Sequence, residues 1–358
     1  MVRMVTRPRL PLMALMLAAV MAGSGSLAGP VSAAALEFDP MPWMGLAAQL
    51  VGPITPSAIS KGTDGRLTVL LVGSDWRPSL AGTGERTDAM MVMTINNSRQ
   101  ISIVSVPRDV GNFPIAPGTI FKPKVNGLFK YFKQTSNGDR NAALEKMRKA
   151  FAYALRIQID YVAYIRFTGL ERLVKEVAGV PTTVAYNIYD SKINDERTSQ
   201  PVGAKFMQSA STLMRGSDAP QCYTMAKPIN WDTVPNCTRA LLYVRSRHGP
   251  GNNDWRRARR QQGFVFAAIR RVIARGSGTN LQSLRSEALS NTTDFYTTLP
   301  TDWGSVLALY NMLNSATMPN QAVFKPRKYA VNVPGTSKQQ LKLDAVRALT
   351  KAWFGPLN

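Results

Sequence analysis

Three apolar runs in the first third of the chain constrain its fold most, because each has the composition of a buried strand. They are residues 67–73 (LTVLLVG), 90–96 (MMVMTIN) and 101–107 (ISIVSVP), and the last two are joined by a hairpin-like NNSRQ. Helical periodicity follows at residues 141–157, after which strand-like and helix-like segments alternate. This alternation predicts an α/β layered domain around a central sheet.

The remaining segments divide into further elements and two irregular stretches. The predicted helices are residues 141–157, 169–179, 255–276, 281–289, 302–313 and 342–354, and the further predicted strands are residues 160–167, 180–188 and 324–333. Residues 36–65 contain Pro and Gly without a clear period and predict a connector, so that residues 66–358 form one domain. Residues 190–237 are polar and interrupted by Gly and Pro, which predicts a long surface insert.

The N-terminal residues predict export. Three arginines precede an apolar run at residues 10–22, and a stretch rich in small residues continues to Ala35. This layout is that of a cleaved signal peptide over residues 1–35. The alternative is a retained N-terminal membrane anchor, since no charge occurs between Arg9 and Glu37. Either one places the body outside the cytoplasm.

The predicted export determines whether the two cysteines are expected to form a disulfide. Cys222 and Cys237 would close a short loop in an oxidising compartment, which favours a disulfide that staples the insert of residues 190–237. Two buried thiols without a bond are the alternative.

The charge balance predicts an anionic partner and excludes several chemistries. Lys and Arg number 44 against 22 Asp and Glu, which gives a formal charge of +22. His248 is the only histidine, which excludes a two-histidine zinc helix, and two cysteines cannot form a four-thiolate metal site. Outside the cytoplasm, the anion is expected to be a lipid pyrophosphate, an anionic headgroup or a wall polymer rather than nucleic acid.

Residues 239–275 concentrate this charge. They include ten arginines, no lysine and one acid, Asp254. Because the planar guanidinium matches phosphate oxygens in a bidentate manner, the cluster favours shaped oxyanion recognition; an Arg-rich helix surface is the simpler alternative. The predicted helix starts polar and becomes apolar, so its N-terminal end is expected to face an anion. Asp254 either caps this helix or acts directly.

Two aspartates mark the ends of neighbouring predicted strands. Asp75 follows the first strand and Asp88 precedes the second, so both are expected at one edge of the sheet. Carboxylates that face each other repel unless a cation lies between them, and Mg²⁺ is commonly bound by one or two carboxylates together with substrate phosphate oxygens. A turn or capping role is the alternative.

Further polar side chains fall just beyond the third strand. Arg108 and Asp109 follow it directly, and Lys124 and Asn126 come shortly after, in PKVNG. Ligands of open α/β sheets bind beyond the carboxyl ends of strands. The sequence thus predicts a metal and many arginines but no nucleophile paired with a histidine. This combination favours phosphoryl or pyrophosphate chemistry, in which the protein positions the substrate and neutralises its charge.

Six separated motifs are shared with one protein family. VGSDWRP, ERTDAMMVMTIN, ISIVSVPRDV, KVNGLF, YVRSRHG and DWRRARRQQ occur in its order over roughly residues 65–275, and together they resemble the LytR-CpsA-Psr family of cell-wall assembly proteins. The resemblance implies an α-β-α layered domain with a central mixed sheet and an internal apolar tunnel for a lipid. It also implies a phosphotransferase that moves a glycopolymer from a polyprenyl-pyrophosphate carrier to the 6-hydroxyl of N-acetylmuramic acid in peptidoglycan.

The resemblance also implies roles for individual residues. Asp75 and Asp88 would hold Mg²⁺ against the pyrophosphate, whereas Arg77 and Arg86 would lie nearer the headgroup or sugar. The residues expected to grip the pyrophosphate or to lie at the same rim are Arg108, Lys124, Asn126, Arg245, Arg247, Arg257, Arg260 and Gln261.

Two questions remain open in the sequence. Asp109 is the first candidate for the base that deprotonates the sugar hydroxyl, and Asp254 is the second. The alternative function is a non-catalytic binder of polyprenyl pyrophosphate or of an anionic wall polymer, which would need the arginines but neither Asp75 nor Asp88. Lipid pyrophosphatase activity is compatible with the transferase.

The chain departs from the family pattern at the arginine-rich helix and in the insert. Arg256 and Arg259 stand where smaller or neutral residues are expected. The insert of residues 190–237 is unusually long, and it is expected to shape selectivity for the acceptor or the polymer.

Overall fold

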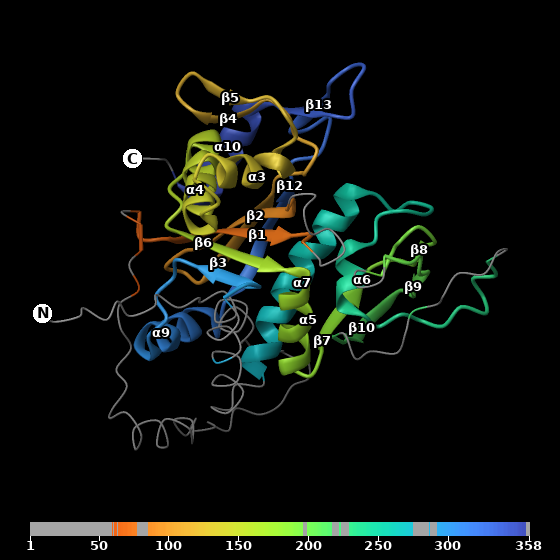
Figure 1. Cartoon of the computed structure of the whole chain (residues 1–358). Coiled ribbons are helices and arrows are strands. Elements are labelled where there is room, and N and C mark those ends of the chain that lie inside the picture. Colours follow the sequence, from red (N-terminus) through yellow and green to blue (C-terminus); the bar gives the residue numbers. More distant parts are fainter. Residues whose placement is uncertain are drawn as a thin grey trace, which may run out of the picture.

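The computed structural model of the chain has a six-stranded mixed sheet at its centre (Figure 1). The structure describes residues 59, 61–62, 64–76, 85–195, 199–216, 222, 229–274, 286 and 292–355. The strands lie in the order β11 (Phe295–Thr297), β6 (Tyr161–Arg166), β1 (Leu67–Ser74), β2 (Thr87–Ile95), β3 (Gln100–Ser105) and β12 (Thr317–Val323). β2 is antiparallel to β1 and β3, whereas β6 runs parallel to β1 and β12 parallel to β3. The three predicted apolar strands are therefore confirmed as neighbours in the core.

Helices cover both faces of this sheet (Figure 1). One face carries α3 (Leu128–Gln134), α4 (Arg140–Leu155) and α10 (Leu343–Phe354), and the other carries α5 (Phe167–Glu176), α6 (Ala240–Arg245) and α7 (Asp254–Ala274). In α4 the Asp139 side chain accepts hydrogen bonds from the backbone N–H groups of Asn141 and Ala142, and an apolar stripe that includes Met147 and Phe151 is fully buried. The α-β-α layering is confirmed.

Smaller elements complete the domain. They are the two-stranded ribbons β4 (Phe113–Ala116) with β5 (Thr119–Phe121) and β13 (Ala330–Asn332) with β14 (Gln339–Leu341), the 3-10 turn η2 (Val125–Gly127), and α9 (Trp303–Leu313), which connects β11 to β12.

The insert is more structured than the sequence pattern predicts. The segment predicted as one strand, 180–188, divides into β7 (Val180–Val184) and β8 (Ile188–Asp190), and both lie outside the central sheet. They pair with two strands inside the predicted loop, β10 (Ser209–Met214) and β9 (Ala204–Phe206). The predicted disulfide between Cys222 and Cys237 is present, with the two Cα atoms 4.9 Å apart.

The two outer strands of the central sheet, β11 and β12, were not predicted from the sequence. β11 has three residues, and β12 is a partly exposed TMPNQAV that contains a proline, which an edge strand tolerates. The segment 324–333 was predicted as a strand of the domain, but only β13 forms there and it pairs outside the central sheet. Short or polar edge strands lack the apolar run that reveals central ones.

Some predicted segments lie outside the described residues: residues 1–35, most of the connector at 36–65, and most of the helix at 281–289. Within the part of the chain that the structure describes, no helix combines the length and the apolarity needed to cross a membrane.

Candidate active site

A cavity of about 320 Å³ lies between the sheet and the helices α5, α6 and α7. Its apolar lining residues include Leu71, Val72, Met91, Ile165, Phe167, Leu170, Ile193, Val244, Phe264 and Val265. Its charged or amide-bearing lining residues are Asp75, Asp88, Arg108, Arg166, Asp190, Lys192, Asn194, Arg245, Arg247, His248, Arg257 and Gln261. Along β1, β2 and α7 the two kinds occupy different positions: Asp75 and Asp88 lie at the strand ends and Leu71 and Met91 within the strands, and Arg257 and Gln261 precede Phe264 and Val265 in the helix. Most of the other polar lining residues come from the end of α6 and from the segments that follow α6 and β8.

Asp75 and Asp88 lie at the same edge of the sheet, which confirms the predicted juxtaposition. β1 ends at Ser74, which pairs with Thr87 at the start of β2. The Asp75 carboxylate accepts a 3.0 Å hydrogen bond from the backbone N–H of Arg86, and the Asp75 N–H donates to the Arg86 carbonyl. Both aspartates line the cavity, and the buried Oδ1 atom of Asp88 has no hydrogen-bond partner.

Arg108 connects three carboxylates at the end of β3. Its Nη1 donates to Asp88 Oδ2 at 2.9 Å, and its Nε lies 4.0 Å from Asp109 Oδ2 and 3.9 Å from Asp254 Oδ1. Burial disfavours the charge of Arg108, but the summed attraction of these carboxylates outweighs that effect and raises its pKa. Arg108 is therefore a permanent cation at the polar end of the cavity.

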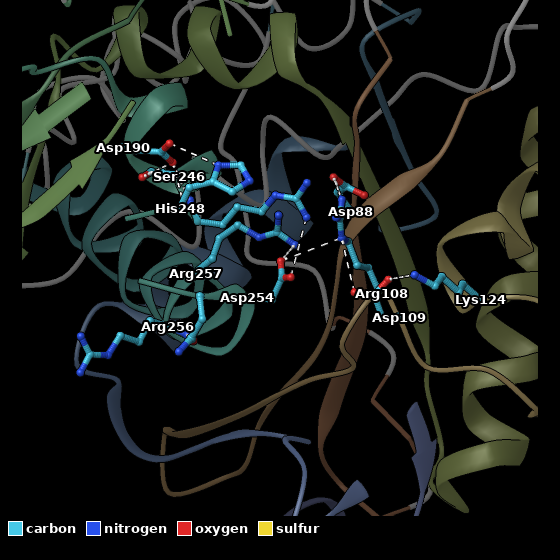
Figure 2. A network of polar contacts seen from close by, with 12 residues as sticks. Asp88, Arg108, Asp109, Lys124, Asp190, Ser246, His248, Asp254, Arg256 and Arg257 are labelled. Atoms are coloured by element: carbon cyan, nitrogen blue, oxygen red, sulfur yellow. Dashed lines mark hydrogen bonds and ion pairs between the residues drawn. The ribbon is translucent and has the colours of Figure 1, made fainter. Parts of the chain in front are cut away.

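The N-terminus of α7 completes the ionic network (Figure 2). Asn253, not Asp254, caps this helix, because its side-chain oxygen accepts a hydrogen bond from the N–H of Arg256. The Asp254 carboxylate instead lies 2.8 Å from Arg257 Nη2 and 3.8 Å from Arg247 Nη1. Burial lowers the pKa of Arg257 despite the attraction of Asp254. The charge on this guanidinium is thus incompletely compensated, which favours an anion nearby.

A second, smaller network anchors the segment after α6. Asp190 is fully buried and accepts hydrogen bonds from Ser246 Oγ and from the backbone N–H groups of Arg247 and His248. His248 Nδ1 lies 3.2 Å from the same carboxylate (Figure 2). Sequence reasoning used His248 only to exclude chemistries. The position of His248 in YVRSRHG, close to two arginines, could have marked it as a site residue. No sequence pattern marked Asp190, because it is the first residue of the predicted insert.

Glu85, which begins the ERTD motif, is a buried residue beside the site that the sequence analysis did not single out. It forms a buried ion pair with Arg166, and it accepts hydrogen bonds from Ser74 Oγ at 2.6 Å and from the Tyr164 hydroxyl. Burial raises the pKa of Glu85, but the hydrogen bonds from Arg166, Ser74 and Tyr164 together lower it below its usual value. This cluster fixes the end of β1, from which Asp75 projects.

The other predicted site residues are dispersed. Lys124 lies 2.5 Å from Asp109, and the buried Asn126 donates its backbone N–H to the Arg108 carbonyl, but neither side chain lines the cavity. Gln261 lines it and donates to the Val244 carbonyl. Arg86 is exposed at the turn, and Arg77 lies outside the described residues.

Arg260, which was grouped with the pyrophosphate-binding residues, lies elsewhere. Its buried guanidinium donates to the Tyr186 hydroxyl at 2.6 Å, to Asn252 Oδ1 at 2.8 Å, and to the carbonyls of Tyr243 and Ser246. It does not line the cavity with Asp75 and Asp88. Four protein acceptors already engage this side chain, so it ties α7 to the segment after α6.

Fold and site together define an α-β-α protein whose internal cavity has an ionic end and an apolar end. The chain belongs to the LytR_cpsA_psr family, whose model matches residues 51–345. The predicted family membership is thereby confirmed.

Individual relatives are distant. The regulatory protein MsrR of Staphylococcus aureus (strain COL) is 26% identical over 200 residues, which are 56% of this chain and 47% of that protein. The chain thus matches about half the length of this curated relative. The crystal structure of Bacillus subtilis TagV superimposes with a TM-score of 0.56 at 16% identity, over 82% of this chain and 98% of TagV. A structure of TagT bound to LI-WTA gives 0.51 at 18% identity, over 83% and 92%. At such identities the two structures establish the fold.

Proposed function

We propose that this protein is a phosphotransferase that moves a glycopolymer from a polyprenyl-pyrophosphate carrier to the 6-hydroxyl of N-acetylmuramic acid in peptidoglycan. The observation that carries the proposal is a single cavity with an arginine-lined end and an apolar end. The donor has the same two parts, a pyrophosphate and a hydrocarbon chain, so each part has a matching environment. Membership of a transferase family and the likeness in fold to TagT, which has been solved with LI-WTA, support this choice.

The arginines supply the binding and charge neutralisation that such a transfer needs. Arg247 lies 3.8 Å from Asp254, a loose ion pair that leaves guanidinium donors available for phosphate oxygens. Arg257 is buried and only partly compensated, and Arg108 stays charged. Donors fixed at the position where charge develops on the leaving phosphate stabilise the transition state without reorganising. The same groups would hold the pyrophosphate in the ground state.

Asp75 and Asp88 would hold Mg²⁺, and the residues present fit that ion. They share a sheet edge, and the buried, unpartnered Oδ1 of Asp88 offers an oxygen ligand. Among the described residues, no three His, Cys, Asp or Glu side chains gather into a metal cluster, so phosphate oxygens and water would complete the coordination, as Mg²⁺ usually requires. When bound, Mg²⁺ would supply a Lewis acid that offsets the pyrophosphate charge.

The proposed reaction takes place at the outer face of the cytoplasmic membrane, where carrier and peptidoglycan meet. The family is associated with the cell envelope. A cleaved signal and a retained anchor would both deliver the domain there. The excess of positive charge would attract the domain to anionic lipid and wall polymer.

The test is a turnover assay with purified protein, a polyprenyl-pyrophosphate-linked glycopolymer and peptidoglycan oligomers. We expect a phosphodiester-linked product and one polyprenyl phosphate released per transfer, both abolished by EDTA and restored by Mg²⁺. Asp88→Asn is the matched variant, because it keeps the shape of the side chain and weakens metal binding. Tight donor binding without any release of polyprenyl phosphate would instead identify a non-catalytic binder.

A further inference from the structure

The single histidine of the chain lines the cavity and lies against a buried carboxylate. His248 lies in the segment after α6, lines the same cavity as Asp75, Asp88 and Arg108, and its side chain is 37% exposed. Its neighbour Asp190 also borders the cavity but is 0% exposed, so the imidazole is the accessible member of this pair. A buried carboxylate behind an accessible imidazole is the arrangement that orients a general base.

The hydrogen bond to Asp190 determines which ring nitrogen of His248 carries the proton. Asp190 also accepts from Ser246 Oγ at 2.8 Å and from the N–H groups of Arg247 and His248 at 2.9 and 3.1 Å, so its position is fixed. A carboxylate can only accept, and the neutral imidazole therefore donates through Nδ1 across the 3.2 Å contact. Nε2 is then left with a lone pair, and no described residue forms a hydrogen bond with it.

The carboxylates that could compete for this role are engaged elsewhere. Asp109 lies against Lys124 and Arg108, and Asp254 lies among Arg108, Arg247 and Arg257. Neither of these two aspartates lines the cavity. Asp75 and Asp88 do line it, but they are the proposed metal ligands. Among the described residues that line the cavity, His248 is the exposed proton acceptor without another assigned role.

We propose that His248, oriented by Asp190, is the general base that deprotonates the acceptor hydroxyl. This assignment rests on the proposed transferase function. The hydroxyl oxygen attacks the phosphorus that bears the glycopolymer, and its proton passes to Nε2. The bond from that phosphorus to the bridging oxygen breaks, and its electron pair leaves with polyprenyl phosphate. The imidazolium then loses its proton to water, which restores the resting state.

Arg247 gives this placement a second support. Asp190 accepts the N–H groups of two consecutive residues, Arg247 and His248, so one buried carboxylate fixes the backbone that presents both. The guanidinium of Arg247 lines the same cavity as the imidazole. In Figure 2 the imidazole lies between Asp190 and the ion pairs of Arg257, Asp254 and Arg108. The base and the phosphate-binding groups are therefore positioned by the same anchor.

The test measures transfer by H248N and H248A beside the wild type, with donor binding and thermal unfolding measured for each. H248N keeps a donor that can reach Asp190 but has no basic nitrogen. We expect kcat to fall at least about 100-fold in both variants, with donor binding and melting temperature little changed. Added imidazole should restore part of kcat in H248A, where the ring has left a space, and should have no effect on the wild type. Arg259→Ala, which removes a side chain that donates to the Gln321 carbonyl and does not line this cavity, is the control and should stay within about twofold of the wild type.

The outcomes separate this inference from the function on which it rests. A wild type that binds the donor without turnover would refute the transferase. If the wild type transfers glycopolymer and H248N keeps at least a third of the wild-type kcat, only the assignment of His248 is refuted. Loss of kcat in H248A that imidazole does not restore would indicate a structural role and would also overturn the assignment.

Discussion

The arginines on the two faces of helix α7 lie in different surroundings. On one face, Arg257 lies 2.8 Å from Asp254 and lines the cavity with Asp75 and Asp88. On the other, Arg256 and Arg259 line a groove of about 620 Å³ between α7, β7 and β12, and no carboxylate is among the described residues that line it. Figure 2 shows Arg256 pointing away from Asp254 and Arg257.

The difference between these faces comes from helical phase rather than composition. Consecutive residues on a helix are rotated by about 100°, so neighbouring arginines reach different surroundings. Arg256 stacks on the Tyr186 ring at 4.5 Å, and Arg259 donates to the Gln321 carbonyl. An arginine beside carboxylates in a cavity is held in a defined position for a ligand, whereas an arginine on the outer face has only local contacts.

The largest expected effect concerns Arg239, the first arginine of the 239–275 window and the most deeply buried. It forms ion pairs with Glu171 at 2.8 Å and with Asp195 at 2.9 Å, and all three residues are buried. Arg239→Ala leaves two carboxylates in the interior, so we expect the free energy of unfolding to fall by about 3–5 kcal/mol. Chemical denaturation measures it, with Arg256→Ala as the control. Equal stability of the two variants would remove the distinction between arginines with carboxylate partners and arginines on the outer face of α7.

The next effect concerns catalysis. Arg108→Ala removes the cation that links Asp88, Asp109 and Asp254, and we expect glycopolymer transfer to fall about 100- to 1,000-fold. Arg247→Ala is expected to act in the same direction, because its guanidinium lines the same cavity. Transfer assays on variants with unchanged circular dichroism measure this loss. Near-normal turnover by either variant would contradict the assignment of the cavity.

The sequence predicted those parts of the site that are close to regular elements. Asp75, Asp88 and Arg108 each lie within a few residues of a strongly apolar strand, so strand order was enough to bring them together. The apolar runs also predicted the centre of the sheet, since buried strands need uninterrupted aliphatic side chains. Motif order then indicated the family.

Contacts between distant segments could not be predicted in this way. Asp190 meets His248 across 58 positions, and Glu85 meets Arg166 across 81. Neither separation leaves a periodic signal, because the pairing depends on how β8 and β6 are placed by the whole fold. Arg260 is a related case: the resemblance in motifs assigned it to the pyrophosphate, whereas the structure surrounds it with Tyr186, Asn252 and two carbonyls.

A smaller, pH-dependent effect is expected at the buried pair of Glu85 and Arg166. Because the pKa of Glu85 is lowered in the folded protein, its ionised form contributes stability above the usual Glu pKa, and this contribution is lost as the pH falls through that range to the lowered value. Glu85→Gln should destabilise the protein by about 1–3 kcal/mol at neutral pH. Melting temperatures from pH 7 downward should converge for the variant and the wild type. A difference that stays constant with pH would show that Glu85 acts through its shape alone.

The smallest effects are expected for the arginines on the outer face of α7. They test whether the two faces of this helix differ in function as they differ in their contacts. Arg256→Ala loses a cation–π contact with Tyr186, and Arg259→Ala loses one hydrogen bond at an exposed position, so each is expected to change the free energy of unfolding by no more than about 1 kcal/mol. Transfer should stay within about twofold of the wild type in both, because neither side chain lines the cavity with Asp75 and Asp88. The measurement is the transfer assay used for Arg108→Ala, run at equal protein and donor concentrations. A loss beyond tenfold in either variant would mean that the groove takes part in the reaction, and that both faces of the helix contact substrate.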